Sequence, residues 1–211
     1  VCAVMVGASD GCRGRLVAAG DGLGLGENTG VMFTTDNGTA GRSKLRAIDN
    51  QNKFEYEKVV SKFGDEMIPG GKGSLTNLGT NVPLIVRWPA KIKEPGVTDK
   101  LVDMSDFFPT SVALAGKEAP ADLNGHNFAP LLTGDAFDGR QFVYAQHGGK
   151  FWVRNERFKL YDDGKPFDIT SDPREKKPIP DDQQSPEASA AREKLAGNMT
   201  SLGLTQNSGK E

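Results

Sequence analysis

Two short segments of the sequence carry side chains suited to binding charged ligands. Asp36, Asn37 and Gly38 follow an apolar run at residues 29–35. A carboxylate beside a carboxamide at a strand end supplies two hard oxygen ligands, which favour Ca²⁺ or Mg²⁺ over zinc. Lys72 lies among glycines at residues 70–74, where its ammonium and nearby backbone N–H groups could approach an anion. These residue types predict a divalent-cation site and an anion site.

Both segments also have simpler interpretations. Asp-Asn-Gly is a common turn sequence, and Asn37 opens a glycosylation sequon, a modification that would exclude metal binding by its side chain. A lysine among glycines is commonly a solvated loop residue, and this one lacks the full spacing of a nucleotide P-loop. Two oxygens are too few for a complete cation shell. The two histidines and two cysteines do not form a zinc set.

Composition limits the kinds of partner. The 211 residues are 36% hydrophobic and 26% charged, which is ordinary for a globular protein. No apolar run approaches the roughly 20 residues of a membrane helix, and the net charge of -2 comes from interspersed acids and bases. We therefore expect neither a membrane nor a nucleic acid as partner. Cys2 and Cys12 are expected about 15 Å apart on one helix, too far for a disulfide.

The hydrophobic pattern predicts an α/β fold in the first two thirds of the chain. Apolar spacings of three and four from Cys2 onward predict an amphipathic helix that ends in the glycines at 20–26. Short apolar runs at 29–35 and 82–88 predict buried strands of the parallel type. The apolar residues at i, i+3, i+4 and i+7 over 56–63 predict a helix. A further helix is expected from the cap at 105–110 to Gly116.

Shorter elements are expected in the last third. Strand candidates separated by turns predict a small antiparallel sheet; they lie at 141–146, 151–154, 158–161 and 167–169. Ser185 opens a last helix that fades near Gly197. We expect a domain over 1–138 with a partial parallel or mixed sheet and flanking helices. A small antiparallel subdomain with the terminal helix should occupy 139–202, and a disordered tail 203–211.

A series of sequence blocks follows one another in a fixed order. They are LGLGENTGVMFTTDNG at 23–38, GGKGS at 70–74, VPLIVRWP at 82–89, DFFPT at 106–110, LAG at 114–116, NG at 124–125, LLTG at 131–134, residues 154–161, FD at 167–168 and DPRE at 172–175. Together they resemble the sulfatase family, the formylglycine-dependent members of the alkaline-phosphatase-like superfamily, over about residues 1–178. The order of the blocks is far more specific than any single block.

The resemblance implies an arylsulfatase-like sulfuric ester hydrolase. Asp36 and Asn37 match the family's pair of ligands to the active-site cation, usually Ca²⁺ and here Ca²⁺ or Mg²⁺, and Lys72 matches its sulfate-binding lysine. The implied substrate is a sulfated small molecule or a sulfated glycan. Family resemblance also implies a periplasmic or secreted location.

The chain departs from the family pattern in two places. Neither Cys2 nor Cys12 lies in the Cys-x-[Pro/Ala]-Ser-Arg motif that is converted to formylglycine. We therefore expect the nucleophile and the paired aspartates of the metal site in a missing N-terminal part of the same protein, and no activity from this chain alone. Residues 77–81, NLGTN, replace the family's Glu-Gly-Gly and arginine. The alternatives are a phosphoesterase of the same superfamily, with a serine or threonine nucleophile, and a non-catalytic remnant or binding module.

Overall fold

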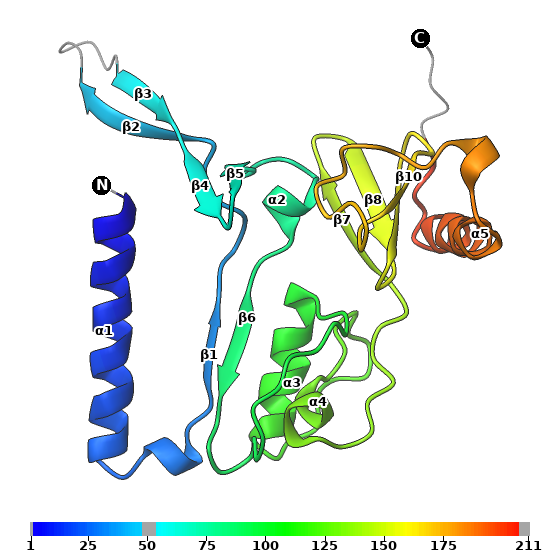
Figure 1. Ribbon diagram of the computed structural model, residues 1–211. Helices are drawn as coiled ribbons and strands as arrows, with labels where there is room; N and C mark the ends of the chain where they lie inside the picture. Colours follow the sequence, from blue (N-terminus) through cyan, green and yellow to red (C-terminus); the bar gives the residue numbers. More distant parts are fainter. Residues whose placement is uncertain (1, 48–53, 207–211) are drawn as a thin grey trace. The chain divides into compact units, whose positions relative to one another are not determined.

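The structure is a computed structural model that describes residues 2–47 and 54–206 (Figure 1). The chain divides into two compact units, each assembled from separate segments. The first comprises residues 1–34, 84–98 and 104–138, and the second comprises residues 35–83, 99–103 and 139–211. The expected domains over 1–138 and 139–202 remain a prediction.

The first unit combines helices with one two-stranded ladder. Its elements are α1 (Cys2–Gly22), η1 (Gly26–Asn28), β1 (Val31–Thr34), β6 (Leu84–Arg87), η2 (Met104–Asp106), α3 (Phe107–Leu114) and α4 (Ala129–Thr133). The helix expected from residues 105–110 is confirmed as α3, and Gly116 follows it in the left-handed region at φ 72°. Asp106 and Thr110 are buried and accept hydrogen bonds from the backbone N–H groups of His126 and Phe128.

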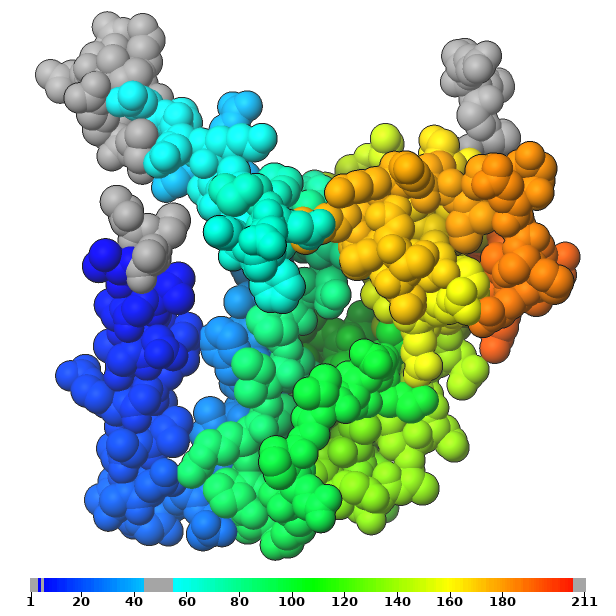
Figure 2. Space-filling view, in the orientation of Figure 1, coloured from blue at the N-terminus to red at the C-terminus, as the bar shows by residue number. Residues whose placement is uncertain are grey.

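The helix predicted from Cys2 is confirmed as α1, but none of its apolar side chains that the structure describes is buried. Leu16 is 72% exposed, and Figure 2 shows α1 in blue at the surface of the face drawn. Arg13 stacks over the ring of Phe33 in β1, with 4.4 Å to the ring centroid. No helix in the part of the chain that the structure describes is both long and apolar enough to cross a membrane.

The pairing of β1 with β6 corrects one expectation. The two strands are antiparallel, with Val31 opposite Arg87 and Thr34 opposite Leu84. The prediction of parallel pairing was wrong because an apolar run indicates burial and carries no information on strand direction. The strands are half-buried rather than buried, and Ile85 is 59% exposed.

The second unit contains hairpins, a four-stranded sheet and a long helix. Its elements are β2 (Arg42–Ala47), β3 (Phe54–Lys58), β4 (Val60–Phe63), β5 (Glu66–Pro69), α2 (Asn77–Thr80), β7 (Val143–His147), β8 (Lys150–Arg154), β9 (Phe158–Tyr161), β10 (Pro166–Asp168), η3 (Asp181–Gln183) and α5 (Pro186–Ser201). The predicted antiparallel sheet is confirmed, with strand order β10-β9-β8-β7. The fold class is therefore confirmed as mixed α/β with small antiparallel sheets and a terminal helix.

The core of the second unit lies between α5 and the central strands β8 and β9 (Figure 1). Val153 and Leu160 have no exposed surface, and Leu195 and Met199 of α5 pack against them at 2% and 1% exposure. The Ser185 side chain accepts a hydrogen bond from the Ala188 N–H at 3.1 Å, which caps α5 as predicted. The helix continues past Gly197 to Ser201, and the end of the expected tail, residues 207–211, lies outside the described residues.

The helix predicted over 56–63 was wrong, because this segment forms parts of two hairpins. β3 ends at Lys58 and β4 begins at Val60. The apolar spacing fitted a helix by coincidence, whereas aromatic and β-branched residues favour strands. The turn at Gly64-Asp65 closes β4 onto β5, with Gly64 at φ 59°. A glycine followed by aspartate between two apolar runs is a hairpin signal that the periodicity obscured.

Candidate functional site

The Asp36–Asn37 turn is held in place by backbone hydrogen bonds to two distant segments. The Gly38 N–H donates to the Gly79 carbonyl at 3.0 Å, which attaches the turn to α2. The Lys72 N–H donates to the Thr39 carbonyl at 2.9 Å. These bonds bring the predicted cation ligands and the predicted anion-binding lysine into one backbone assembly, although more than thirty residues of chain separate them.

Two glycines allow these segments to approach so closely. A Cβ atom on Gly38 would lie 1.8 Å from the Leu78 carbonyl oxygen, and one on Gly79 would lie 2.1 Å from the Ser74 carbonyl oxygen. Any side chain at either position would push backbone away from backbone. Gly38 therefore packs the turn against α2, and Gly79 packs α2 against the Lys72 loop, residues 70–74.

Asp36, Asn37 and Lys72 line one cavity of about 590 Å³. The volume lies within the range of small-molecule binding sites. Among the described residues, none of these three side chains has a hydrogen-bond or ion-pair partner, and the Asp36 carboxylate does not pair with the Lys72 ammonium. Polar groups that face a cavity without internal partners remain available to a ligand.

The donor atoms present fit part of a hard-cation shell. Asp36 and Asn37 supply a carboxylate and a carboxamide oxygen, the ligand types that Ca²⁺ and Mg²⁺ prefer. Within the described ranges, no three His, Cys, Asp or Glu side chains come together in a way that could hold a metal ion. A cation bound at this turn would take the rest of its ligands from water, substrate or groups outside the described residues.

The cavity also has lining residues that sequence reasoning missed. Ser61 of β4 and Ile68 of β5 are register partners and both face the cavity. Their role depends on the β4–β5 hairpin, so its Gly64-Asp65 turn was the available signal. Asn77 and Asn81, which stand within the departure from the family pattern at 77–81, line the same cavity.

A buried polar cluster contacts Leu75 and Asn77, which follow the Lys72 loop in the chain. It comprises Lys159 and Tyr161 of β9 and Glu175, and the charged side chains of Lys159 and Glu175 are 0% and 1% exposed. The Lys159 Nζ donates to a Glu175 carboxylate oxygen at 3.0 Å and to the Leu75 carbonyl at 2.9 Å. The single proton of the Tyr161 hydroxyl is shared between the same carbonyl, at 3.2 Å, and the Glu175 carboxylate. Sequence reasoning assigned these residues no role, because the Leu75 carbonyl that both donors share lies 84 and 86 positions away in the chain.

Burial dominates the titration of this cluster. It lowers the pKa of Lys159 to about 8, although the Glu175 carboxylate acts in the opposite direction. Burial and the hydrogen bond to Glu175 raise the pKa of Tyr161. Burial also lowers the pKa of the nearby Arg154, again opposed by Glu175. Glu175 is therefore the anion that holds several buried donors in their charged or protonated forms.

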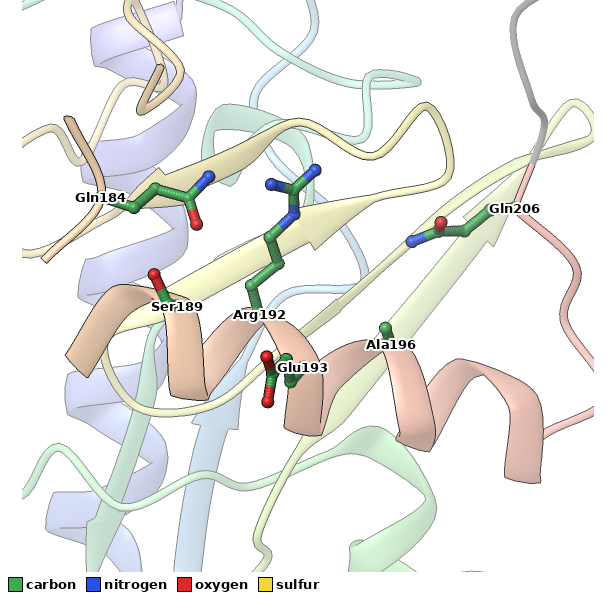
Figure 3. A pocket seen from close by; sticks show the side chains of 6 residues that line it. All are labelled: Gln184, Ser189, Arg192, Glu193, Ala196 and Gln206. Carbon is green, nitrogen blue, oxygen red and sulfur yellow. The ribbon is translucent and has the colours of Figure 1, made fainter. Parts of the chain in front are cut away.

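A second hollow, of about 380 Å³, lies along α5 (Figure 3). Among the described residues that line it, Arg192 is the only cation. The guanidinium donates to the Asp181 carboxylate at 2.5 Å and to the Gly164 carbonyl at 3.2 Å. Because this cation is already engaged, the hollow offers no available cation to an anionic group, unlike the cavity at Asp36 and Lys72.

The chain is similar to sulfatases along most of its length. The family model described as "Sulfatase" matches residues 5–117, and the model described as "N-sulphoglucosamine sulphohydrolase, C-terminal" matches residues 72–202. Mouse steryl-sulfatase is 36% identical over 125 residues, covering 58% of this chain and 18% of the relative. Human arylsulfatase A is 33% identical over 159 residues, covering 72% of this chain and 28% of the relative. The chain thus spans less than a third of the length of these relatives.

The fold is also found among solved structures. A sulfatase from Pseudoalteromonas sp. superposes with a TM-score of 0.66 at 22% identity, over 90% of this chain and 40% of that protein. At this level of identity the comparison establishes a shared fold.

Proposed function

The chain belongs to the sulfatase family of hydrolases, and from this premise we propose that the protein hydrolyses a sulfate ester in the cavity lined by Asp36, Asn37 and Lys72. The observation that carries the proposal is that these three side chains line one cavity and have no partner among the residues that the structure describes. Its substrate would be a sulfated small molecule or a sulfated glycan. The family resemblance leads us to propose a periplasmic or secreted site of action.

Each of the three side chains has a distinct role in this proposal. The Lys72 ammonium would hold the sulfate group through charge-assisted hydrogen bonds and stabilise the negative charge that grows on its oxygens during ester cleavage. Asp36 and Asn37 would hold a divalent cation, Ca²⁺ or Mg²⁺, which supplies Lewis-acid polarisation of sulfate oxygens when bound. The formylglycine nucleophile would come from the upstream part of the protein.

The remaining volume of the cavity fits the alcohol part of the ester. Ser61 offers a hydroxyl and Ile68 an apolar surface on the wall formed by β4 and β5. A site that combines a few polar groups with apolar surface orients an organic ligand as well as binding its charge.

The proposal is tested with the protein expressed from its complete coding sequence. Hydrolysis of 4-nitrophenyl sulfate should lose about 10²–10³-fold in kcat/KM in Lys72→Met, the loss typical of removing one group that stabilises developing charge. Lys62→Met is the matched control, because Lys62 neighbours the cavity-lining Ser61 and strand alternation points it to the opposite face of β4. Equal activity of Lys72→Met and Lys62→Met would overturn the role of Lys72.

The cation is tested separately. Asp36→Asn should raise the Ca²⁺ concentration required for half-maximal activity at least about tenfold, since even outer-shell partners of a metal contribute that much. An unchanged Ca²⁺ requirement would remove Asp36 from the site. Faster hydrolysis of 4-nitrophenyl phosphate than of the sulfate would favour the phosphoesterase alternative instead.

A further inference from the structure

The Lys72 loop contains glycines at positions 70, 71 and 73, so its own sequence does little to fix the position of the lysine. The first part of the loop is anchored because the Lys72 N–H donates to the Thr39 carbonyl at 2.9 Å. A tight turn follows, in which the Ser74 N–H donates to the Gly71 carbonyl at 2.9 Å. The next residue, Leu75, is where the buried cluster holds the chain.

The cluster binds one backbone group of Leu75 and one of Asn77. The Leu75 carbonyl accepts from both Lys159 Nζ and the Tyr161 hydroxyl, at 2.9 Å and 3.2 Å. The Asn77 N–H donates to a Glu175 carboxylate oxygen at 2.6 Å. The Asn77 side chain donates from Nδ2 to the Pro173 carbonyl at 3.2 Å and accepts from Lys159 at 3.4 Å. Leu75 and Asn77 therefore have little freedom to move.

All the hydrogen-bonding capacity of the buried ammonium is used. Lys159 Nζ has three N–H groups and three acceptors, which are the Leu75 carbonyl, the Asn77 amide oxygen and the Glu175 carboxylate. It also lies 4.4 Å from the centroid of the Trp152 ring. A fully satisfied buried network is rigid, whereas its net contribution to stability is small because both charges must be desolvated. This combination is more typical of a device for fixing geometry than of one for stabilising the fold.

The segment that supplies Glu175 also contacts the β4–β5 hairpin, which contributes Ser61 and Ile68 to the cavity. Arg174 forms an ion pair with Glu66, the first residue of β5. Glu175 itself adopts φ 55°, the one described non-glycine residue in the left-handed region. That conformation costs about 1–2 kcal/mol for an L-residue, and such strain persists where surrounding contacts impose it. Two consecutive residues of one turn therefore contact both segments: Arg174 contacts the β4–β5 hairpin, and Glu175 contacts the chain that follows the Lys72 loop.

We propose that Lys159, Tyr161 and Glu175 are positioning residues that fix the Lys72 loop in the geometry required for binding the anionic group of the substrate. This inference rests on the proposed function, because it assigns the cluster to the same site. The benefit to binding is preorganisation: the ordering of a glycine-rich loop is completed during folding and need not accompany each binding event.

The test measures coupling between the cluster and Lys72 in the protein expressed from its complete coding sequence. The probe is inorganic sulfate, and its dissociation constant is determined by calorimetry in the presence of Ca²⁺. Glu175→Gln should weaken sulfate binding by about tenfold, an effect within the range of coupled neighbouring groups. In a Lys72→Met background the same substitution should have no further effect. Glu187→Gln, which alters the exposed Arg157–Glu187 pair, is the matched control and should not change the affinity.

A merely structural role would give a different result. It would lower the melting temperature and weaken sulfate binding by the same factor in both backgrounds, which would overturn the inference. If Lys72→Met alone leaves sulfate affinity unchanged, the proposed function fails rather than the positioning role.

A milder substitution keeps the test decisive if Glu175→Gln does not fold. Tyr161→Phe removes only the hydroxyl and retains the ring that packs edge-on against Phe167 at 5.5 Å. It should weaken sulfate binding by a smaller factor, which again disappears in the Lys72→Met background. An unchanged affinity in folded Tyr161→Phe, at equal Ca²⁺ occupancy, would overturn the role of the hydroxyl contact to Leu75.

Discussion

Substitution of Gly38 by alanine should push the Asp36–Asn37 turn away from α2. The new Cβ would lie 1.8 Å from the Leu78 carbonyl oxygen and 3.0 Å from the Gly79 Cα, whereas ordinary contacts begin at 3.4 Å. Both obstacles are backbone atoms, so no side-chain rotation relieves the overlap. The turn and α2 must move apart by more than an ångström, which breaks the 3.0 Å hydrogen bond from Gly38 to Gly79.

The expected cost combines two terms. Overpacking of this kind destabilises by about 1–3 kcal/mol, and the lost backbone hydrogen bond adds about 0.5–1.5 kcal/mol. Misplacement of a binding group by about 1 Å can reduce catalysis about 10²-fold. Gly38→Ala should therefore lower both the free energy of unfolding in urea and the sulfate affinity of the protein expressed from its complete coding sequence.

Gly197→Ala provides the matched control. Gly197 lies inside α5, and a Cβ there meets no atom within 4 Å. Because alanine is the better helix former, this variant should gain up to about 1 kcal/mol of stability. The reasoning is refuted if Gly38→Ala keeps its unfolding free energy and its sulfate affinity close to those of the unsubstituted protein, since the close backbone approach would then be unimportant.

Further predictions concern the chain and the buried cluster. The 211-residue chain, purified alone, should release no product from an aryl sulfate, because neither cysteine lies in the formylglycine motif; steady or burst release would contradict this. In hydrogen exchange of the same chain, the amides of Val153 and Leu160 should be far better protected than that of Ile85, because the first two residues are fully buried and the last is 59% exposed. Equal protection would contradict a difference in local stability between the core of the second unit and the β1–β6 ladder. Lys159 has a folded-state pKa of about 8 against an ordinary 10.5, so between these pH values the unfolded chain binds a proton that the folded chain does not. The unfolding free energy of the unsubstituted protein, relative to Lys159→Met, should therefore rise with pH across this window, and a fall would show that the ammonium form is favoured by folding.

The sequence alone singled out the candidate site residues. Asp36, Asn37 and Lys72 stood out because oxygen ligands and a cation among glycines are suited to few functions, and the order of blocks related them to one family. Secondary structure that depends on local sequence patterns was also predicted correctly. The cap at Ser185 and the short alternating strands from 141 to 169 depend on neighbouring residues, and both elements are present.

Only the tertiary structure decided how those residues come together. Strand direction in the β1–β6 pair and the anchoring of Lys159 and Tyr161 on the Leu75 carbonyl depend on partners distant in the sequence. The two hairpins in place of a helix over 56–63 and the buried pair Lys159–Glu175 depend on strand pairing and burial that the local pattern does not show. A lysine and a glutamate look like surface residues when read singly, since burying either alone is strongly unfavourable. Their burial becomes possible only when the fold supplies the opposite charge and the backbone acceptors at once, and that coincidence is a property of three-dimensional packing.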